Sequence, residues 1–231
     1  MNRVLREEKK FLISIDEAIQ KSDSLSAVLA ADPHNGTNGY TVRSLYFDTL
    51  FDSDLYDKLA GIETRRKIRL RCYSPKDDFA MLEMKQKQGA NQLKRSLRLS
   101  REDVIRLTKA DYTPLLKYSE PFAAECYALM NLRCYRPKTI VEYNRKAFIA
   151  KENKTRITFD SNITATESSF DLFDERLNRY PVLDKYDVVL EVKFNGFLLD
   201  YIRRMLNSIN RSELSVSKYA LARQQGCLTR L

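Results

Sequence analysis

The chain has 231 residues, and its 40 Lys and Arg against 31 Asp and Glu give a formal net charge of +9 at pH 7. Hydrophobic residues make up 43% of the chain, with 6 Gly and 6 Pro, which excludes disordered, collagen-like and low-complexity proteins. No apolar run approaches the ~20 residues needed to span a bilayer, and residues 1–10 lack the apolar core of a signal peptide. We therefore expect a cytoplasmic globular protein whose partners are polyanions.

Cysteine and histidine usage argues against zinc sites and catalytic triads. The cysteines, Cys72, Cys126, Cys134 and Cys227, form no C-x-x-C pair, and His34 is the only histidine. Neither a zinc site with short ligand spacing nor a histidine-based triad is therefore expected. Because no secretion signal is present, we expect four reduced thiols, two of them in the core.

Capping signatures and periodicity predict the elements in chain order. Ser14 with Glu17 is a capping box that predicts a helix toward Ala31, and Ser100 with Asp103 predicts another helix start. Period-two segments predict strands over residues 8–13, 40–48, 67–73, 79–87, 93–99, 139–149, 156–160 and 188–194. Further helices are expected over residues 102–109, 114–132 and 198–209. With no repeat and no linker, residues 1–231 are predicted to form a single α+β domain dominated by antiparallel strands.

Charged residues recur on one face of strand after strand. Successive side chains alternate faces, so Lys67, Arg69 and Arg71 share one face and apolar residues take the other. The same alternation gives further charged rows: Glu8 and Lys10; Glu83, Lys85 and Lys87; Lys94 and Arg98; Tyr143 and Arg145; Arg156 and Asp160; Glu191 and Lys193. A solvated sheet face is the ordinary explanation of such charges. A merely solvated face would carry many Thr, Ser and Gln, whereas these positions are mostly Lys, Arg and Glu. Rows of cations on neighbouring strands would repel one another unless an anion lies among them. We therefore favour a closed barrel that holds a phosphate chain among these rows, with Mg²⁺ or Mn²⁺ on the glutamates.

These residues resemble the triphosphate tunnel metalloenzymes (the CYTH superfamily), and within it the vacuolar transporter chaperone (VTC) domain of polyphosphate polymerases. The matching stretches follow the family's order over nearly the whole chain: Arg6–Phe11, Arg43–Asp48, Lys67–Tyr73, Leu82–Lys85, Tyr143–Arg145, Leu190–Lys193 and Ser217–Tyr219. Each stretch alone is weakly specific, but seven in order are strongly so. The resemblance implies a closed antiparallel eight-stranded β-barrel, with helices packed outside, that binds a nucleoside triphosphate and a divalent cation.

The resemblance also implies roles for individual residues. The catalytic cations on the triphosphate would be Arg69, Arg71, Lys85 and Arg145. Further phosphate-binding residues would be Lys10, Lys94, Lys193 and Lys218, with Tyr143 and Ser217 as hydroxyl donors. Glu191 resembles the metal-binding glutamate, with Glu8 and Glu83 as helpers.

The resemblance includes both polymerases and hydrolases. VTC-type members move the γ-phosphate of ATP onto a growing polyphosphate chain, whereas several CYTH relatives hydrolyse triphosphates. Hydrolytic members open with E-x-E-x-K, but here Arg6 takes the first place and gives R-x-E-x-K. We therefore expect a metal-dependent polyphosphate polymerase, with a triphosphatase as the alternative. Coupling to transport would require a separate membrane protein.

Two other classes of function fit parts of the pattern. A polyphosphate- or nucleotide-binding module without turnover would keep every cation but would tolerate the loss of Glu191. A nucleic-acid-binding protein fits the charge of +9. Glutamates within the cationic rows would repel a nucleic-acid backbone, however, and the aromatic residues fall mainly on apolar-looking positions such as Phe47 and Phe159. We therefore expect no nucleic-acid partner.

Overall fold

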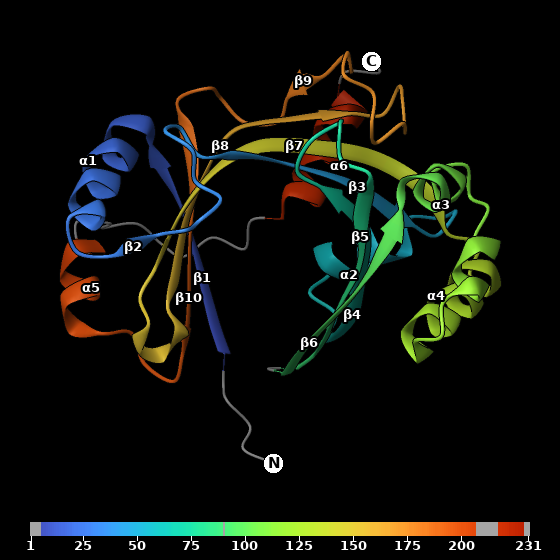
Figure 1. The fold of residues 1–231 in the computed structure, drawn as a ribbon, viewed down its shortest axis with the longest axis horizontal. Helices are drawn as coiled ribbons and strands as arrows, with labels where there is room; N and C mark the ends of the chain where they lie inside the picture. The colour runs from blue at the N-terminus through green and yellow to red at the C-terminus, as the bar shows by residue number, and fades with distance from the viewer. Residues whose placement is uncertain (1–5, 90, 207–216, 229–231) are drawn as a thin grey trace. The chain divides into compact units, whose positions relative to one another are not determined.

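The computed structural model describes residues 6–89, 91–206 and 217–228 (Figure 1). The strands are β1 (Arg6–Ser14), β2 (Ala30–Ala31), β3 (Tyr40–Asp48), β4 (Thr64–Cys72), β5 (Phe79–Gln88), β6 (Asn91–Ser100), β7 (Arg136–Ile149), β8 (Arg156–Thr166), β9 (Tyr180–Pro181) and β10 (Asp187–Asn195). The helices are α1 (Ile15–Ser26), α2 (Ser53–Leu59), α3 (Arg101–Leu107), α4 (Pro121–Leu132), α5 (Asp200–Leu206) and α6 (Lys218–Leu228), with short 3-10 helices η1 (Thr113–Lys117) and η2 (Glu152–Lys154). None of the described helices is both long and apolar enough to cross a membrane.

The strands form one antiparallel sheet in the order β1-β10-β8-β7-β3-β4-β5-β6, with β2 paired to β7 and β9 paired to β8. This confirms the predicted α+β class and its antiparallel sheet. Within the described residues the ladder ends at β1 and at β6, so the hydrogen-bonded closure expected of a barrel is not found. Alternation along a strand fixes the face of each side chain but does not specify which strand is its neighbour.

The contacts of the chain group it into two compact units. Unit 1 contains residues 1–41, 143–163 and 183–217, and unit 2 contains residues 42–142, 164–182 and 218–231. The assignment of all 231 residues to a single domain stays a prediction.

The predicted helix starts are confirmed at both capping signatures. The backbone N–H of Glu17 donates to Ser14 Oγ over 3.2 Å, and the N–H of Ser14 donates to Glu17 Oε2 over 3.0 Å. At α3, the N–H of Asp103 donates to the hydroxyl of Ser100 over 3.2 Å. These bonds, which are reciprocal at α1, satisfy amide donors that the first turn of a helix leaves without a partner.

Two predicted helices end differently in the structure. The segment 114–132 is divided into η1 and α4, because Glu120 precedes Pro121 and adopts an extended conformation. Helix α1 ends at Ser26, and the two alanines predicted at its end form β2 instead. The helix predicted over 198–209 begins at Asp200, and its expected end lies outside the described residues.

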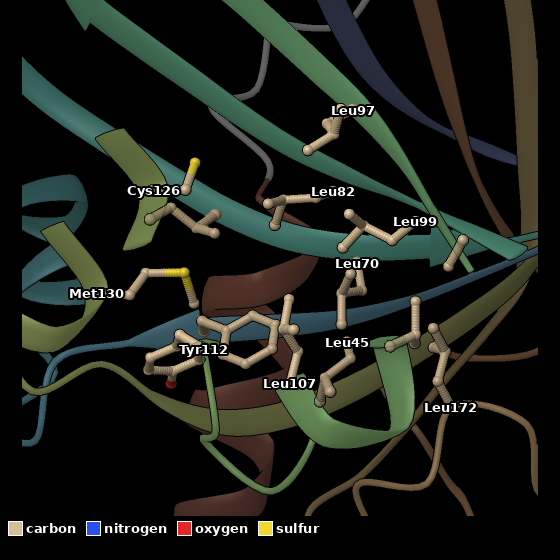
Figure 2. Packing of buried hydrophobic residues seen from close by; sticks show 14 of the residues in the cluster. Leu45, Leu70, Leu82, Leu97, Leu99, Leu107, Tyr112, Cys126, Met130 and Leu172 are labelled. Carbon is tan, nitrogen blue, oxygen red and sulfur yellow. The ribbon is translucent and has the colours of Figure 1, made fainter. Parts of the chain in front are cut away.

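Unit 2 has a core between its sheet and the segment α3–η1–α4. Figure 2 shows Leu45, Leu70 and Leu82 from the strands together with Tyr112 and Met130 from that segment. All of these side chains are buried, which accounts for the apolar rows on β3, β4 and β5. The core also contains the free thiols of Cys72 and Cys126, as expected, and a third free thiol, Cys134, is exposed. The side chain of Cys227 lies outside the described residues.

Unit 1 has its own core, formed where α1 and α5 lie side by side against β1, β10 and β8 (Figure 1). Ile13, Leu25, Leu190 and Ile202 are all fully buried in it. The strand residues Ile13 and Leu190 point toward the helices, so the opposite face of the same strands presents the polar residues.

Asp48, at the end of β3, anchors two helices that the sequence did not predict. Its carboxylate accepts hydrogen bonds from the backbone N–H groups of Thr49, Asp54 and Leu55 over 2.7–2.9 Å, which caps the start of α2. The hydroxyl of Tyr219 on α6 also donates to this carboxylate, over 2.7 Å. A carboxylate so fully hydrogen-bonded within the fold has a structural role.

Asp54 is predicted to make the stability of the protein depend on pH. Burial, together with nearby Asp48, raises the pKa of Asp54 to about 7, although it accepts a 2.8 Å hydrogen bond from Tyr135. The folded state binds the proton of the Asp54 carboxyl more tightly than the unfolded state does. The stabilisation that this proton gives is therefore complete below pH ~4 and is lost as the pH rises toward 7. Denaturant titrations should show that the unfolding free energy of Asp54→Asn rises relative to that of wild type by up to about 4 kcal/mol between pH 4 and pH 8. An unchanged difference between the two proteins would contradict this assignment.

Candidate functional site

The polar face of unit 2 is built from the alternate residues of β4, β5 and β6. In β4, Ile68 and Leu70 are fully buried in the core, while Arg69 and Arg71 point to the opposite face with Glu83 of β5. The predicted alternation is thus confirmed on these strands. The antiparallel register places Arg69 directly opposite Glu83.

Glu83 is the centre of an ion-pair cluster on this face. Its carboxylate is only 3% exposed and lies 2.7 Å from Arg69 Nη2, 2.6 Å from Arg71 Nη2 and 2.7 Å from Lys94 Nζ. Arg69 also donates to the hydroxyl of Tyr46 over 3.2 Å. The carboxylate therefore holds two guanidinium groups and one ammonium group at fixed positions on one surface.

The cluster around Glu83 is predicted to support folding in mild acid. Burial alone would raise the pKa of Glu83, but Arg69, Arg71 and Lys94 outweigh it and lower the pKa to about 2. A depressed carboxylate pKa stabilises the fold above its ordinary value of 4.5, and this stability is lost as the pH falls toward 2. The difference in unfolding free energy between wild type and Glu83→Gln should shrink by about 3 kcal/mol between pH 6 and pH 2. A difference that stays constant over this range would contradict the ion-pair role.

Three lysines lie opposite one another across the strands, and the third of them, Lys94, is also part of the cluster around Glu83. Lys67 of β4 lies opposite Lys85 of β5, which lies opposite Lys94 of β6. Like charges directly opposite each other destabilise a sheet. An anionic ligand on this face would offset that repulsion, so the row is a candidate phosphate-binding surface.

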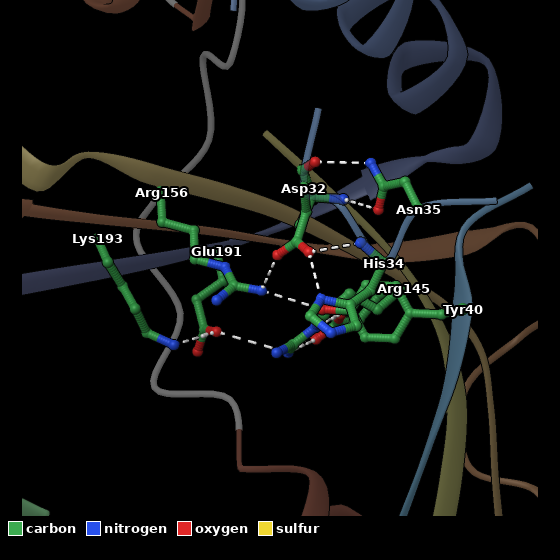
Figure 3. A network of polar contacts seen from close by, with 10 residues as sticks. Asp32, His34, Asn35, Tyr40, Arg145, Arg156, Glu191 and Lys193 are labelled. Carbon is green, nitrogen blue, oxygen red and sulfur yellow. Dashed lines mark hydrogen bonds and ion pairs between the residues drawn. The ribbon is translucent and has the colours of Figure 1, made fainter. Parts of the chain in front are cut away.

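The polar face of unit 1 has Glu191 at its centre. This carboxylate is 6% exposed and contacts Lys193 at 2.7 Å, Lys10 at 3.3 Å and Arg145 at 3.8 Å. Lys10 also contacts Glu8 at 2.8 Å. Figure 3 shows Glu191 between Lys193 and Arg145, so residues from β1, β7 and β10 meet here.

Arg145 is fixed in place by two other side chains of unit 1. It donates two hydrogen bonds to the fully buried Asp160, at 2.6 and 2.7 Å, and its guanidinium lies 5.2 Å from the ring centre of Tyr143. A bidentate pair of this kind fixes both the position and the plane of the guanidinium. Asp160 is the residue that gives Arg145 this geometry, a role that the parity of β8 alone did not indicate.

The residues of unit 1 include a fitting donor set for a divalent cation. Glu8 and Glu191 both contact Lys10 Nζ, at 2.8 and 3.3 Å, and their oxygens are the hard ligands that Mg²⁺ and Mn²⁺ prefer. Magnesium in phosphate-binding sites commonly takes one or two carboxylates and completes its shell with water and substrate phosphate. Across the described residues, no group of three or more acidic, His or Cys side chains forms a fuller metal cage.

The structure places the predicted site residues in two sets. The unit 1 set comprises Glu8, Lys10, Tyr143, Arg145, Glu191 and Lys193. The unit 2 set comprises Arg69, Arg71, Glu83, Lys85 and Lys94. Ser217 is buried and Lys218 begins α6. Glu83, expected to help bind metal, is held by three cations in unit 2, whereas Glu8 and Glu191 are neighbours in unit 1.

Comparison with known families and structures identifies the fold. The profile of the family described as the VTC domain matches residues 5–225. The chain belongs to the VTC domain family. The predicted resemblance to VTC domains is thereby confirmed, and the two polar faces are those of a VTC domain.

Two solved structures share the fold of this VTC domain. An adenylate cyclase candidate from Bacillus halodurans has a TM-score of 0.53 and 14% identity, covering 92% of this chain and 95% of that one. An adenylyl cyclase candidate from Hippeastrum, described as having a dominant triphosphatase activity, has a TM-score of 0.53 and 13% identity, covering 94% and 95%. A search of curated proteins finds no match. The chain thus shares its fold with these two proteins.

Proposed function

We propose that this VTC domain is an ATP-dependent polyphosphate polymerase. The observation that carries the proposal is the pair Arg69 and Arg71, held by the buried Glu83 beside a row of lysines. Guanidinium groups fixed in this way bind phosphate oxygens through charge-assisted hydrogen bonds. The family match and the tunnel fold support phosphate-transfer chemistry rather than recognition of nucleic acid.

The transfer itself needs no protein nucleophile. A terminal oxygen of the polyphosphate acceptor attacks the γ-phosphorus of ATP, and the bond from that phosphorus to the bridging oxygen breaks. The electron pair of that bond stays on the departing ADP. Arg69, Arg71 and Lys85 would bind the equatorial oxygens and neutralise the charge that spreads over the transferred group.

As the family resemblance implies, the residues of unit 1 would contribute metal binding and positive charge. Glu191 and Glu8 would hold Mg²⁺ or Mn²⁺, which would offset the charge of the leaving diphosphate when bound. Lys10, Lys193 and Arg145 lie around these carboxylates and would add phosphate contacts. Tyr143 supports the guanidinium of Arg145 and would offer its hydroxyl to a phosphate oxygen. Ser217 and Lys218 would supply a further hydroxyl and a further cation.

Triphosphate hydrolysis is the second candidate function. The Hippeastrum protein shares this fold and is described as a triphosphatase, although at 13% identity the likeness concerns the fold alone. The same phosphate-binding cations would serve hydrolysis, with water as the acceptor in place of polyphosphate. The two activities differ in their products, so a product assay separates them.

The test is to incubate the purified protein with ATP and Mn²⁺ and to quantify ADP, orthophosphate and acid-stable polymer together. The polymerase predicts polymer phosphate in equal amount to ADP, with little orthophosphate. Orthophosphate equal to ADP, without polymer, would assign the protein to the triphosphatases. If ATP stayed intact in the presence of a short polyphosphate primer, a binding module without turnover would be the remaining explanation, and the proposal would be overturned.

A further inference from the structure

The polar face of unit 2 changes character along its strands. At one end, the cross-strand rows contain only cations and amides, such as Lys85 opposite Lys94 and Lys87 opposite Gln92. Toward the other end, Met81 and then Phe79 take the same face of β5, because the alternation continues unbroken from Lys85. The face is thus strongly cationic at one end and aromatic at the other.

At the aromatic end, Arg98 stacks on Phe79. Its guanidinium carbon lies 3.7 Å from the centre of the phenyl ring, the shortest of the cation–aromatic distances in the described structure. Arg98 is exposed, and within the described residues it forms no ion pair. One face of the planar guanidinium therefore rests on the ring, while the other is available to a second flat group.

Arg71 forms a similar contact beside it. Its guanidinium lies 5.2 Å from the ring centre of Tyr73, and its Nε is buried without a hydrogen-bond partner. The register aligns Arg71, Met81 and Arg98 in one row across β4, β5 and β6. Arg71 itself reaches Glu83 at 2.6 Å and so belongs to the phosphate-binding cluster. The groups left at this end are aromatic rings, the thioether of Met81 and the guanidinium of Arg98, which are well suited to stack a flat, polarisable ring.

The separation of the two ends agrees with the size of a nucleotide. Met81 and Lys85 are four residues apart on β5, which corresponds to about 14 Å along an antiparallel strand. An extended nucleoside triphosphate has a comparable length from its base to its terminal phosphate. A base stacked on Arg98, which lies in the row of Met81, would therefore place the γ-phosphate near the lysine row.

We propose that Phe79, Arg98 and Tyr73 form a stacking site for the base of a nucleoside triphosphate. This inference rests on the proposed function. It places the nucleoside at the aromatic end of the surface and names the residues that make a nucleotide bind more tightly than inorganic triphosphate. Stacking does not depend on hydrogen bonds to base edges, so purine nucleotides should be accepted alike.

The test compares the binding of ATP and of inorganic triphosphate by calorimetry, in wild type and in Arg98→Lys. Lysine keeps the positive charge but loses the plane that stacks. Because stacking on a side chain contributes about 1–3 kcal/mol per base, the Kd for ATP should rise roughly tenfold while that for triphosphate stays unchanged. Phe79→Leu should have the same effect, since it removes the ring beneath the guanidinium.

Lys87→Ala is the matched control on the same face, at its cationic end. This variant should raise the Kd for ATP and the Kd for triphosphate by the same factor. If Arg98→Lys weakened the binding of ATP and of triphosphate equally, or left both unchanged, the stacking site would be overturned while the proposed function stayed in place. If wild type binds neither ligand, the proposed function fails, and the stacking site fails with it.

Discussion

Replacing Arg69 by alanine is expected to lower ATP turnover by about 10²–10³-fold, since one preorganised donor to the transferred phosphate is lost. The fold should tolerate the change, because Glu83 keeps its contacts with Arg71 and Lys94. Steady-state kinetics and a thermal melt on the same preparation separate the two effects. A turnover within tenfold of wild type would contradict the catalytic role. A large fall in melting temperature would instead identify Arg69 as structural.

Arg95→Ala is the matched control for this prediction. Arg95 lies on β6 and pairs with Glu125 of α4, on the side of the strand that faces the helices. It is partly exposed, so its ion pair contributes at most about 1 kcal/mol. The variant loses the same charge from the same sheet, and its turnover should match wild type. A loss equal to that of Arg69→Ala would mean that net charge, rather than the position of the guanidinium, controls the reaction.

Replacing Glu191 by glutamine is expected to lower turnover by at least about 10²-fold and to raise the metal concentration required for half-maximal activity. Glutamine keeps the shape of the side chain but removes the charge that faces Lys10, Lys193 and Arg145. ATP binding in the absence of metal should be retained or strengthened, because the cations then lose a competing carboxylate. Kinetics over a Mn²⁺ titration, together with calorimetry without metal, measures both effects.

Asp200→Asn provides the control in the same unit. Asp200 is 69% exposed at the start of α5, where it pairs with arginines of its own helix. Its loss should change neither turnover nor metal requirement. If Glu191→Gln behaved like this control, the glutamate would have no part in catalysis. A binding module without turnover would then be the better account of the chain.

The faces of the charged strand residues were predicted well, because strand alternation alone decides them. Arg69, Arg71 and Glu83 occupy one face of unit 2 because their neighbours Ile68 and Leu70 are buried, and this pattern is visible in the sequence. Alternation could not reveal the partner of each charge. That depends on the register between strands, which places Glu83 opposite Arg69 and makes it an anchor for cations.

Helices α2 and α6 were missed for a related reason. Helix α2 has no side-chain cap at its own N-cap residue, Asp52, and it is capped instead by Asp48 at the end of the preceding strand. Helix α6 is tied to the same carboxylate by Tyr219, a hydrogen bond over 171 positions of sequence. Local sequence patterns report short-range capping, so tertiary anchors of this kind are invisible to them.

Transfer of the γ-phosphate to a phosphate acceptor can be followed through labelled ATP. The protein is incubated with Mn²⁺, a short polyphosphate primer and ATP labelled at either the γ- or the α-phosphate. A polymerase incorporates the γ-label into acid-stable polymer in step with ADP formation, while the α-label remains in ADP. Release of the γ-label as orthophosphate, with none in polymer, would show that the acceptor is water and not polyphosphate.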